Sequence, residues 1–373
     1  MTPVVSKLGV LTKIRTGKLD ANASSEDGEY PFFTCAKQPL RISSYSYDCE
    51  CVLVAGNGDL NVKYYEGKFD AYQRTYILET LPEKKSELHL RYVYHFMEKY
   101  LEKLREQSIG GIIKYIKLGN LTDAKIPLPP LEEQKRIAGI LDAADILRAK
   151  RREALAKLDD LLQSTFLDMF GDPVTNPKGW EVPTLGDICT KITDGTHHSP
   201  PVTEDGIPYI TAKHLKIDGL KFFENPWFVS KEDHEQIYSR CDPKPGDVLY
   251  IKDGATTGIA AINRYDFPFS MLSSLALIRP DTEVFLAEFL CAFLNNERNK
   301  MHLLENMGGA AIKRLTLTKI KKFKVPLPPL DLQRRFAEIV SSVEEQKAKM
   351  RKHLEQLDDL FASLQQRAFR GDL

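Results

Sequence analysis

The chain lacks several features that would set it apart from ordinary globular proteins. No apolar run in its 373 residues approaches the roughly 20 residues that a membrane-spanning helix needs, and the N-terminus has no apolar signal-peptide core. The six cysteines are scattered, and only Cys49 and Cys51 are close in sequence. This spacing excludes a disulfide framework and a zinc-ligand pattern, so we expect free thiols in a cytoplasmic protein.

Net charge is lacking as well. The chain has 52 basic and 52 acidic residues, and no long stretch of it is strongly basic. Composition alone therefore gives no sign of a nucleic-acid-binding protein. With 42% hydrophobic and 28% charged residues, the chain is typical of globular proteins, and its length allows more than one core.

Motifs of catalysis are also absent. The sequence has no Gly-x-x-x-x-Gly-Lys-Ser/Thr phosphate loop and no Gly-x-Gly-x-x-Gly after a strand. His197 and His198 lie in a turn-rich stretch, 193–201, without a third ligand at a recognisable spacing, so a loop that packs on its module or contacts a ligand is favoured over a metal site. We therefore expect a non-catalytic chain with no metal and no cofactor of its own.

What the sequence does contain is a long repeat. Residues 126–138, Ile-Pro-Leu-Pro-Pro-Leu-Glu-Glu-Gln-Lys-Arg-Ile-Ala, recur at 325–337 as Val-Pro-Leu-Pro-Pro-Leu-Asp-Leu-Gln-Arg-Arg-Phe-Ala, an offset of 325 − 126 = 199 residues. The same offset relates the Leu-Asp-Asp-Leu motifs at 158–161 and 357–360. Solenoid repeats are only about 20–50 residues long. The repeat therefore indicates two fused half-molecules, each with a globular module and an arm.

The modules before the arms are predicted to be mixed α/β (α+β). Strand-like runs and one long helix precede each arm, and a Gly-Gly pair (110–111 and 308–309) follows each helix. The predicted strands are 51–55, 74–78, 208–211, 247–251 and 274–278, and the predicted helices are 90–107 and 287–306. The predicted domains are 1–126 (first module), 127–172 (central helical region), 173–325 (second module) and 326–373 (C-terminal helical region).

Each arm is predicted to be a long helix. Pro-Leu-Pro-Pro cannot lie inside a helix, so it makes an extended approach with Pro130 or Pro329 at the first turn. Apolar residues then recur every three or four positions in the same phase, and this pattern predicts that the arms pack together as a coiled coil. Gln346 falls at the position of Leu147, and Arg151 at that of Met350. These polar interruptions either fix the register or lie at a solvated edge.

The two Pro-Leu-Pro-Pro-Leu-x-x-Gln-(Lys/Arg)-Arg segments, the Leu-Asp-Asp-Leu helices, and the Thr-Asp-Gly-Thr-His-His-Ser-Pro-Pro run at 193–201 resemble the specificity subunits of type I restriction–modification systems. The resemblance covers the whole chain, although the first module lacks the His-His-x-Pro-Pro run. It implies that each module reads one half of a split DNA target and that the arms form an antiparallel coiled coil. It also implies docking of two methyltransferase (modification) subunits and of motor–nuclease (restriction) subunits, with S-adenosylmethionine, ATP and Mg on those partners.

Residues of the types that suit contact with double-stranded DNA lie on polar segments that we expect to be loops. In the first module they are Lys13, Arg15, Lys18, Lys37, Arg41, Asn57, Arg74 and Lys114, and in the second Thr193, Thr196, His197, His198, Lys213, His214, Lys252, Thr256, Lys313 and Arg314. The basic cluster 319–324 either faces phosphate or is the solvent side of a strand. The residues expected to dock partners or form the spacer helices are Gln134, Arg136, Ile137, Leu158, Leu161, Gln333, Arg335, Phe336, Leu357 and Leu360.

Two questions stay open at this point. The arms alone also fit a duplicated coiled-coil scaffold that binds proteins, and only the resemblance of the modules argues against it. Residues 1–8 either belong to the first module or pair with Gly371–Leu373, as a circular arrangement of the two halves would predict.

Overall fold

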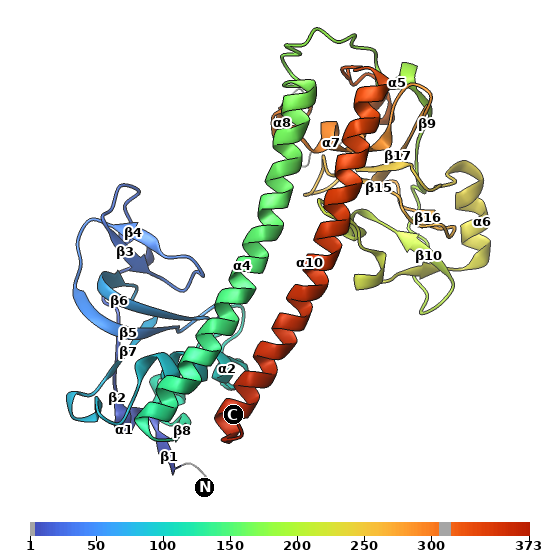
Figure 1. Ribbon diagram of the computed structural model, residues 1–373. Helices are drawn as coiled ribbons and strands as arrows, with labels where there is room; N and C mark the ends of the chain where they lie inside the picture. The colour runs from blue at the N-terminus through green and yellow to red at the C-terminus, as the bar shows by residue number, and fades with distance from the viewer. Residues whose placement is uncertain (1–3, 306–314) are drawn as a thin grey trace. The chain divides into compact units, whose positions relative to one another are not determined.

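The structure, a computed structural model, describes residues 4–305 and 315–373. It divides into two compact units, Met1–Glu153 with Arg351–Leu373 (unit 1) and Ala154–Met350 (unit 2). Two long helices, α4 (Leu131–Phe170) and α10 (Leu330–Arg370), run through both units (Figure 1). Among the described residues, no helix is long and apolar enough to cross a membrane. All six cysteines are unpaired, as the sequence predicts.

Unit 1 is built on a six-stranded sheet of order β2-β7-β5-β6-β3-β4. Its neighbouring strands are antiparallel except for β3 and β6, which pair in parallel. The strands are β2 (Thr12–Thr16), β3 (Tyr30–Phe33), β4 (Leu40–Ile42), β5 (Tyr47–Ala55), β6 (Val62–Ala71) and β7 (Thr75–Thr80). Short helices α1 (Leu8–Leu11) and α3 (Leu118–Thr122), and the turns η1 (Ala21–Ala23) and η2 (Pro82–Lys84), complete the module.

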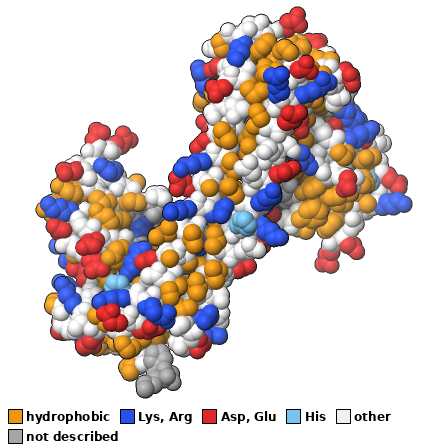
Figure 2. All heavy atoms as spheres, viewed as in Figure 1, with side chains coloured by type: hydrophobic (Ala, Val, Ile, Leu, Met, Phe, Trp, Pro, Cys, Tyr) orange, Lys and Arg blue, Asp and Glu red, His pale blue; other side chains and the backbone are white. Residues whose placement is uncertain are grey.

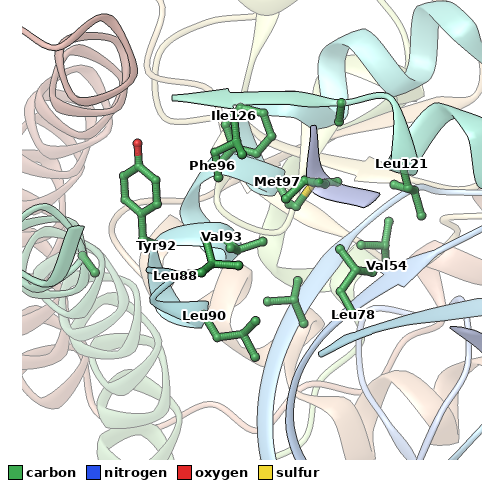
Figure 3. Packing of buried hydrophobic residues seen from close by; sticks show 14 of the residues in the cluster. Val54, Leu78, Leu88, Leu90, Tyr92, Val93, Phe96, Met97, Leu121 and Ile126 are labelled. Atoms are coloured by element: carbon green, nitrogen blue, oxygen red, sulfur yellow. The ribbon is translucent and has the colours of Figure 1, made fainter. Parts of the chain in front are cut away.

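Helix α2 (Leu90–Gln107) supplies the core of unit 1. Its buried face, which includes Val93 and Met97, packs against Val54 and Leu78 of the sheet (Figure 3). The predicted helix 90–107 is thus confirmed. It ends because Ser108 adopts an extended backbone, so the Gly-Gly pair at 110–111 follows the helix without capping it.

The first described residues form β1 (Val4–Lys7), which pairs antiparallel with β8 (Lys125–Leu128), Val4 opposite Leu128. Unit 2 has the equivalent pairing, with Glu181 opposite Leu327. For residues 4–7 the first alternative holds, because their strand pairs with β8 and not with Gly371–Leu373. Val4 also lines one cavity together with Gly371 and Leu373.

Unit 2 contains an antiparallel sheet of order β15-β14-β17-β9, a second sheet of order β13-β10-β16, and a hairpin, β11-β12. The strands are β9 (Cys189–Asp194), β10 (Ile207–Ile210), β11 (Leu215–Lys216), β12 (Gly219–Leu220), β13 (Phe228–Val229), β14 (Val248–Ile251), β15 (Ala260–Ile262), β16 (Ser270–Met271) and β17 (Leu275–Pro280). The shorter helices are α5 (Leu185–Ile188), α6 (Lys231–Arg240) and α9 (Leu317–Lys321), with turns η3 (Ala212–His214) and η4 (Phe222–Glu224).

One sequence prediction in unit 2 was wrong, and one of two open alternatives is excluded. The single helix expected over 287–306 is two helices, α7 (Ala287–Asn295) and α8 (Glu297–Glu305). The break lies at Asn296, whose backbone is extended and whose Oδ1 accepts the Asn299 N–H at 3.1 Å. The basic cluster 319–324 begins in helix α9 and is not a strand. Residues 306 and 308–309 lie outside the described residues.

The long helices pack against each other in antiparallel fashion within each unit. In unit 1 the beginning of α4, including Ile137 and Leu141, shares a core with Phe361 near the end of α10. In unit 2 the end of α4, at Phe166, lies against Phe336 near the start of α10. The predicted pairing is confirmed. Pro130 lies just before the helix, and its carbonyl oxygen accepts the N–H groups of residues 133 and 134.

One of the two interrupted positions of the helix pair lies at the surface. Leu147 is 53% exposed, and Gln346 is exposed as well. The first interruption is therefore a solvated edge and does not fix the register.

Candidate nucleic-acid interface

Three turns of unit 1 that carry predicted DNA contacts meet at one end of the sheet. The Gly56 N–H donates to the Arg74 carbonyl oxygen (2.8 Å), and the Gly58 N–H donates to the Lys114 carbonyl oxygen (3.0 Å). These bonds bring Asn57, Arg74 and Lys114 together, although 57 residues separate the first from the last (114 − 57). We call the segments 16–20, 56–61, 72–75 and 108–116 loop junction 1.

Gly17 brings a fourth segment into loop junction 1. Its N–H donates to the Thr75 carbonyl oxygen (3.0 Å), and a Cβ at this position would lie 2.1 Å from the Ala71 carbonyl oxygen. No side chain fits at that distance, so the chain can approach this closely only with glycine. Lys18 follows directly and is exposed.

Unit 2 has the same arrangement. The Lys252 N–H donates to the Ser274 carbonyl oxygen (2.9 Å), and the Ser273 N–H donates to the Thr196 carbonyl oxygen (2.8 Å). Gly195 matches Gly17, since a Cβ there would lie 1.9 Å from the Met271 carbonyl oxygen. We call 194–199, 252–258 and 272–274 loop junction 2. The backbone pattern is shared, whereas the side chains on the two junctions differ.

A buried carboxylate organises loop junction 2. The Asp194 side chain is 3% exposed, and Lys252 Nζ lies 3.3 Å from it with only 4% of its own side chain exposed. Arg240 also pairs with Asp194, and His197 Nε2 lies 3.4 Å away. A cavity of about 440 Å³ opens beside these groups, lined by His197, His198 and Arg240 among others. Lys252 was predicted to contact DNA, but the structure buries its side chain against Asp194 and does not present it at the surface of the loop.

His214 is the second predicted DNA contact that the structure places inside the module. It is 1% exposed; its Nδ1 accepts the Thr211 N–H at 3.0 Å, and its Nε2 lies 2.9 Å from the Asn225 carbonyl oxygen. Burial lowers the pKa of this imidazole, which favours the neutral ring. Lys213 lies over the Trp227 ring and is half-buried, and burial lowers its pKa as well.

Several first-module candidates lie on strands and not in loops. Lys13 and Arg15 are in β2, and Arg41 is in β4. Arg15 pairs with Glu79 at 2.6 Å, whereas Arg41 donates to the Gly28 carbonyl oxygen at 2.7 Å. Only the exposed Lys13 has no such partner among the interactions of the described residues.

The remaining candidates lie at or near the junctions. Lys37 is exposed and lies 3.6 Å from Asp59 of loop junction 1. Thr193 is half-buried at the end of β9, and Thr256 is exposed in loop junction 2. Lys313 and Arg314 lie outside the described residues.

Sequence reasoning missed an apolar tip on loop junction 1. Ile112 is fully exposed and Ile113 is 62% exposed, directly before Lys114. The signal for this tip was present in the sequence, since Gly-Gly-Ile-Ile-Lys at 110–114 has a counterpart in Gly-Gly-Ala-Ala-Ile-Lys at 308–313.

Ion pairs between α4 and α10 occur at positions that the 199-residue repeat relates to each other. Arg148 Nε lies 2.6 Å from Asp358 in unit 1, and Lys347 Nζ lies 2.7 Å from Asp159 in unit 2. The offset relates both partners, because 148 + 199 = 347 and 159 + 199 = 358. The Leu-Asp-Asp-Leu motifs thus supply one carboxylate to each pair. The distribution of charge over the visible face is mixed, with basic and acidic side chains interspersed (Figure 2).

Comparison with known proteins identifies the family. Residues 3–157 and 177–358 match the family described as type I restriction modification DNA specificity domain. The chain belongs to this family. It is similar to the EcoDI specificity subunit of Escherichia coli, with 42% identity over 42% of this chain and 34% of that protein. It is also 25% identical to the EcoBI specificity subunit of Escherichia coli, over 76% of this chain and 65% of that protein. The aligned parts thus span less than two thirds of both relatives.

Solved structures of the specificity family share the fold. The S subunit of a type I restriction–modification system from M. genitalium superposes with a TM-score of 0.61 over 99% of both chains, at 18% identity. A chain from a structure of type I R-M complex assembly and conformational transition superposes with a TM-score of 0.54, at 19% identity. These likenesses confirm the predicted fold class of two mixed α/β modules with paired long helices.

The residues expected on the spacer helices of this specificity-domain chain fall into two groups. Gln134, Ile137, Gln333 and Phe336 are buried, so they hold each helix to its own module and are not accessible to a partner. Arg136, Leu161, Arg335 and Leu360 are exposed, and Leu158 and Leu357 are half-buried. Within 4–305 and 315–373, no group of three His, Cys, Asp or Glu residues could hold a metal ion.

Proposed function

We propose that the chain is the non-catalytic DNA-sequence-specificity subunit of a type I restriction–modification complex and that each module reads one half of a split, asymmetric target. One observation carries this proposal. The two modules share equivalent backbone hydrogen bonds at their loop junctions, such as Gly56 to Arg74 and Lys252 to Ser274, with different side chains on each junction. Two loop junctions with a similar backbone and different side chains suit two different half-sites in double-stranded DNA.

The side chains of loop junction 1 suit readout in the major groove. Arg74 can contact guanine and Asn57 can contact adenine, while Lys18 and Lys114 suit phosphate contacts. Ile112 suits apolar contact with the methyl group of thymine, which only the major groove presents. A buried isoleucine would be explained by packing in the core. Ile112 is fully exposed beside these polar groups, so packing within the module does not explain it.

Loop junction 2 presents a different set. Thr196, His197 and His198 line or border the cavity beside Arg240, and we assign them to the second half-site. Asp194 acts as a positioning residue, because its carboxylate holds Lys252 and Arg240 beneath the loop.

The exposed helix residues are the proposed docking sites for partners. Arg136 and Leu161 on α4 repeat as Arg335 and Leu360 on α10 (136 + 199 and 161 + 199), so two copies of one methyltransferase subunit would meet equivalent side chains. Restriction subunits would join that complex, and S-adenosylmethionine, ATP and Mg would be held by the partners. The domain limits 1–126, 127–172, 173–325 and 326–373 are part of this proposal.

The test is a methylome. The chain is co-expressed with its methyltransferase partner in a host free of DNA methylation, and modified bases are mapped by single-molecule sequencing. We expect a split motif with a fixed spacer that disappears when the chain is omitted. If the complex forms and methylates but no motif depends on the chain, the scaffold alternative takes the place of this proposal.

A further inference from the structure

Four lysines are clustered in unit 2, on helix α9 and directly after it. They are Lys319, Lys321, Lys322 and Lys324, and all four side chains are exposed. Among the described residues, none of the four has an ion-pair partner. The chain as a whole has no net charge, so this is a local excess of positive charge. We call these residues the α9 lysine cluster.

The residues between the lysines hold the backbone of the cluster in place. Ile320, Phe323 and Val325 are buried in the core of unit 2. The Leu185 N–H donates to the Phe323 carbonyl oxygen (2.9 Å), and the Val325 N–H donates to the Pro183 carbonyl oxygen (3.0 Å). Because this backbone is anchored, the positive charges stay at one place on the surface.

Three of the lysines line an open cavity of about 440 Å³, namely Lys319, Lys322 and Lys324. The other polar side chains on its wall carry amide or imidazole groups, and none of the described residues that line it is acidic. A hollow lined by charges of one sign concentrates the electric field and attracts ions of the opposite sign. The cavity therefore suits an anionic group.

The α9 lysine cluster adjoins loop junction 2. The Leu315 N–H donates to the Lys252 carbonyl oxygen at 2.8 Å, and Leu315 also lines the cavity. The chain thus passes from the junction into α9 within a few residues. A polyanion bound at loop junction 2 would lie close to these lysines.

Unit 1 has the same backbone without the same charge. The repeat relates α3 to α9 (118 + 199 = 317), and the buried positions of the two segments agree. The positions of Lys319, Lys321 and Lys322 are occupied in unit 1 by Asn120, Thr122 and Asp123. Asp123 is paired with Lys7 at 2.8 Å. The fold does not require the lysines, since unit 1 forms the same segment without them.

We propose that the α9 lysine cluster contacts the phosphate backbone of DNA beside the second half-site, and that unit 1 makes no equivalent contact through α3. The inference rests on the proposed function, because DNA must lie on loop junction 2. Lysine binds phosphate as a point charge, and phosphate contacts position a protein on DNA without reading its bases. The cluster adds salt-dependent affinity and leaves the recognised sequence unchanged.

The experiment uses the complex of the full chain with its methyltransferase partner and a DNA duplex that carries the methylated motif. The binding constant is measured at salt concentrations between about 50 and 200 mM. Each phosphate contact that is lost lowers the slope of log binding constant against log salt by about 0.9, so Lys319→Gln with Lys322→Gln should lower it by about 2. A duplex of the same length without the motif should lose affinity by the same factor.

A matched variant controls for net charge. Lys85→Gln with Lys99→Gln removes two exposed lysines of unit 1 and should leave the slope unchanged. Thermal melts show that both double variants fold. Ethylation of single phosphates locates the contact. It should interfere with binding beside the second half-site in the unaltered complex, and that interference should disappear with Lys319→Gln and Lys322→Gln.

Three outcomes would overturn the proposal. The first is a slope that the α9 variant leaves unchanged. The second is an unchanged slope with fewer methyltransferase subunits in the variant complex, which would assign the cluster to an acidic protein surface. The third is interference lost equally beside both half-sites.

The methylome separates a failure of this inference from a failure of the proposed function. The α9 variant should methylate the same motif as the unaltered chain, because phosphate contacts carry no sequence information. If no motif depends on the unaltered chain, the proposed function fails. A motif that depends on the chain, together with an unchanged salt slope, contradicts the α9 contact alone.

Discussion

Gly17 and Gly195 decide whether the loop junctions can close. A Cβ at either position would lie 2.1 or 1.9 Å from a backbone carbonyl oxygen, and backbone cannot move aside as a flexible side chain can. We expect Gly17→Ala to lower the free energy of unfolding by about 2 kcal/mol or more, in the range of strongly destabilising single substitutions. Chemical denaturation measures this change.

Gly111→Ala is the matched control for that substitution. It lies in loop junction 1 as well, but a Cβ there would meet nothing within 4 Å. Its free energy of unfolding should match that of the unaltered chain. Equal stability of both variants would contradict the close approach at Gly17.

Ile112 gives a second prediction at the residue scale. If its side chain contacts a thymine methyl group, replacing thymine by deoxyuridine in the first half-site should weaken binding of the complex by about 1 kcal/mol, near the lower end of single base discrimination. Ile112→Ala should bind both DNAs equally, with the affinity that the unaltered complex has for the deoxyuridine site. Equal sensitivity to deoxyuridine in both proteins would contradict the assignment.

Residue types predicted several residues that meet at loop junction 1, but they did not predict which of the candidate side chains are buried. The sequence predicts Asn57, Arg74 and Lys114 as DNA contacts, and the structure brings them together. The sequence predicts His214 and Lys252 on the same grounds, but both are buried. The difference depends on Asp194 and Asn225, which reach these residues only in the folded module, and no local pattern predicts such contacts.

At the scale of elements, apolar periodicity predicted the long helices because their burial repeats with helical spacing. It did not predict the break at Asn296, where a single side-chain contact to the Asn299 N–H starts a new helix. It also placed Leu147 in the helix pair, although this residue is exposed. The sequence pattern does not show at which residue the apolar stripe of a helix leaves the interface and becomes exposed.

Two buried glutamines fasten the long helices to their modules. Gln134 accepts the His89 N–H and donates to the Glu87 and Pro129 carbonyl oxygens, and Gln333 makes the equivalent bonds with Leu286 N–H and two carbonyl oxygens. Removing either amide leaves buried backbone groups without partners, at a cost of about 1–3 kcal/mol for each unsatisfied group.

Hydrogen exchange separates the two glutamines. Gln134→Ala should speed exchange of the His89 amide and leave that of Leu286 unchanged, and Gln333→Ala should do the reverse. Each substitution is the control for the other. Acceleration at both amides in either variant would show that the two contacts are not independent.

The contact of the Asp142 carboxylate in unit 1 depends on pH. Burial raises the pKa of Asp142, but hydrogen bonds from Arg91 and His95 outweigh it and hold this pKa below its usual value. The lowered pKa means that the contact stabilises the fold above the unfolded pKa of about 3.9 and loses this effect as pH falls through the folded pKa. The equivalent position in unit 2 is Ser341 (142 + 199).

We therefore expect Asp142→Asn to lower the free energy of unfolding by about 1 kcal/mol at pH 7, a modest value because the pair is partly exposed to solvent. The difference from the unaltered chain should shrink below about pH 4. Denaturation curves at pH 7 and pH 3.5 test this. A difference that stays constant over this range would mean that packing, and not charge, makes the contact.

At the scale of the whole molecule, the sequence predicted two modules and two arms because the arm sequences are similar in the two halves of the repeat. It did not predict that the modules share a loop junction, since that likeness lies in backbone hydrogen bonds such as Gly56 to Arg74 and Lys252 to Ser274. Backbone geometry can persist while side chains change. This shared backbone geometry, together with the family of the chain, supports the proposed DNA target.

The most direct measurement is a methylome of the complex with one loop junction altered at a time. Arg74→Ala with Asn57→Ala changes junction 1, and Thr196→Ala with His197→Ala changes junction 2. We predict that each pair relaxes or abolishes recognition at one half of the split motif and leaves the other half and the spacer unchanged. Loss of sequence preference at both halves from either pair, or at neither half from both, would contradict the claim that each module reads its own half-site.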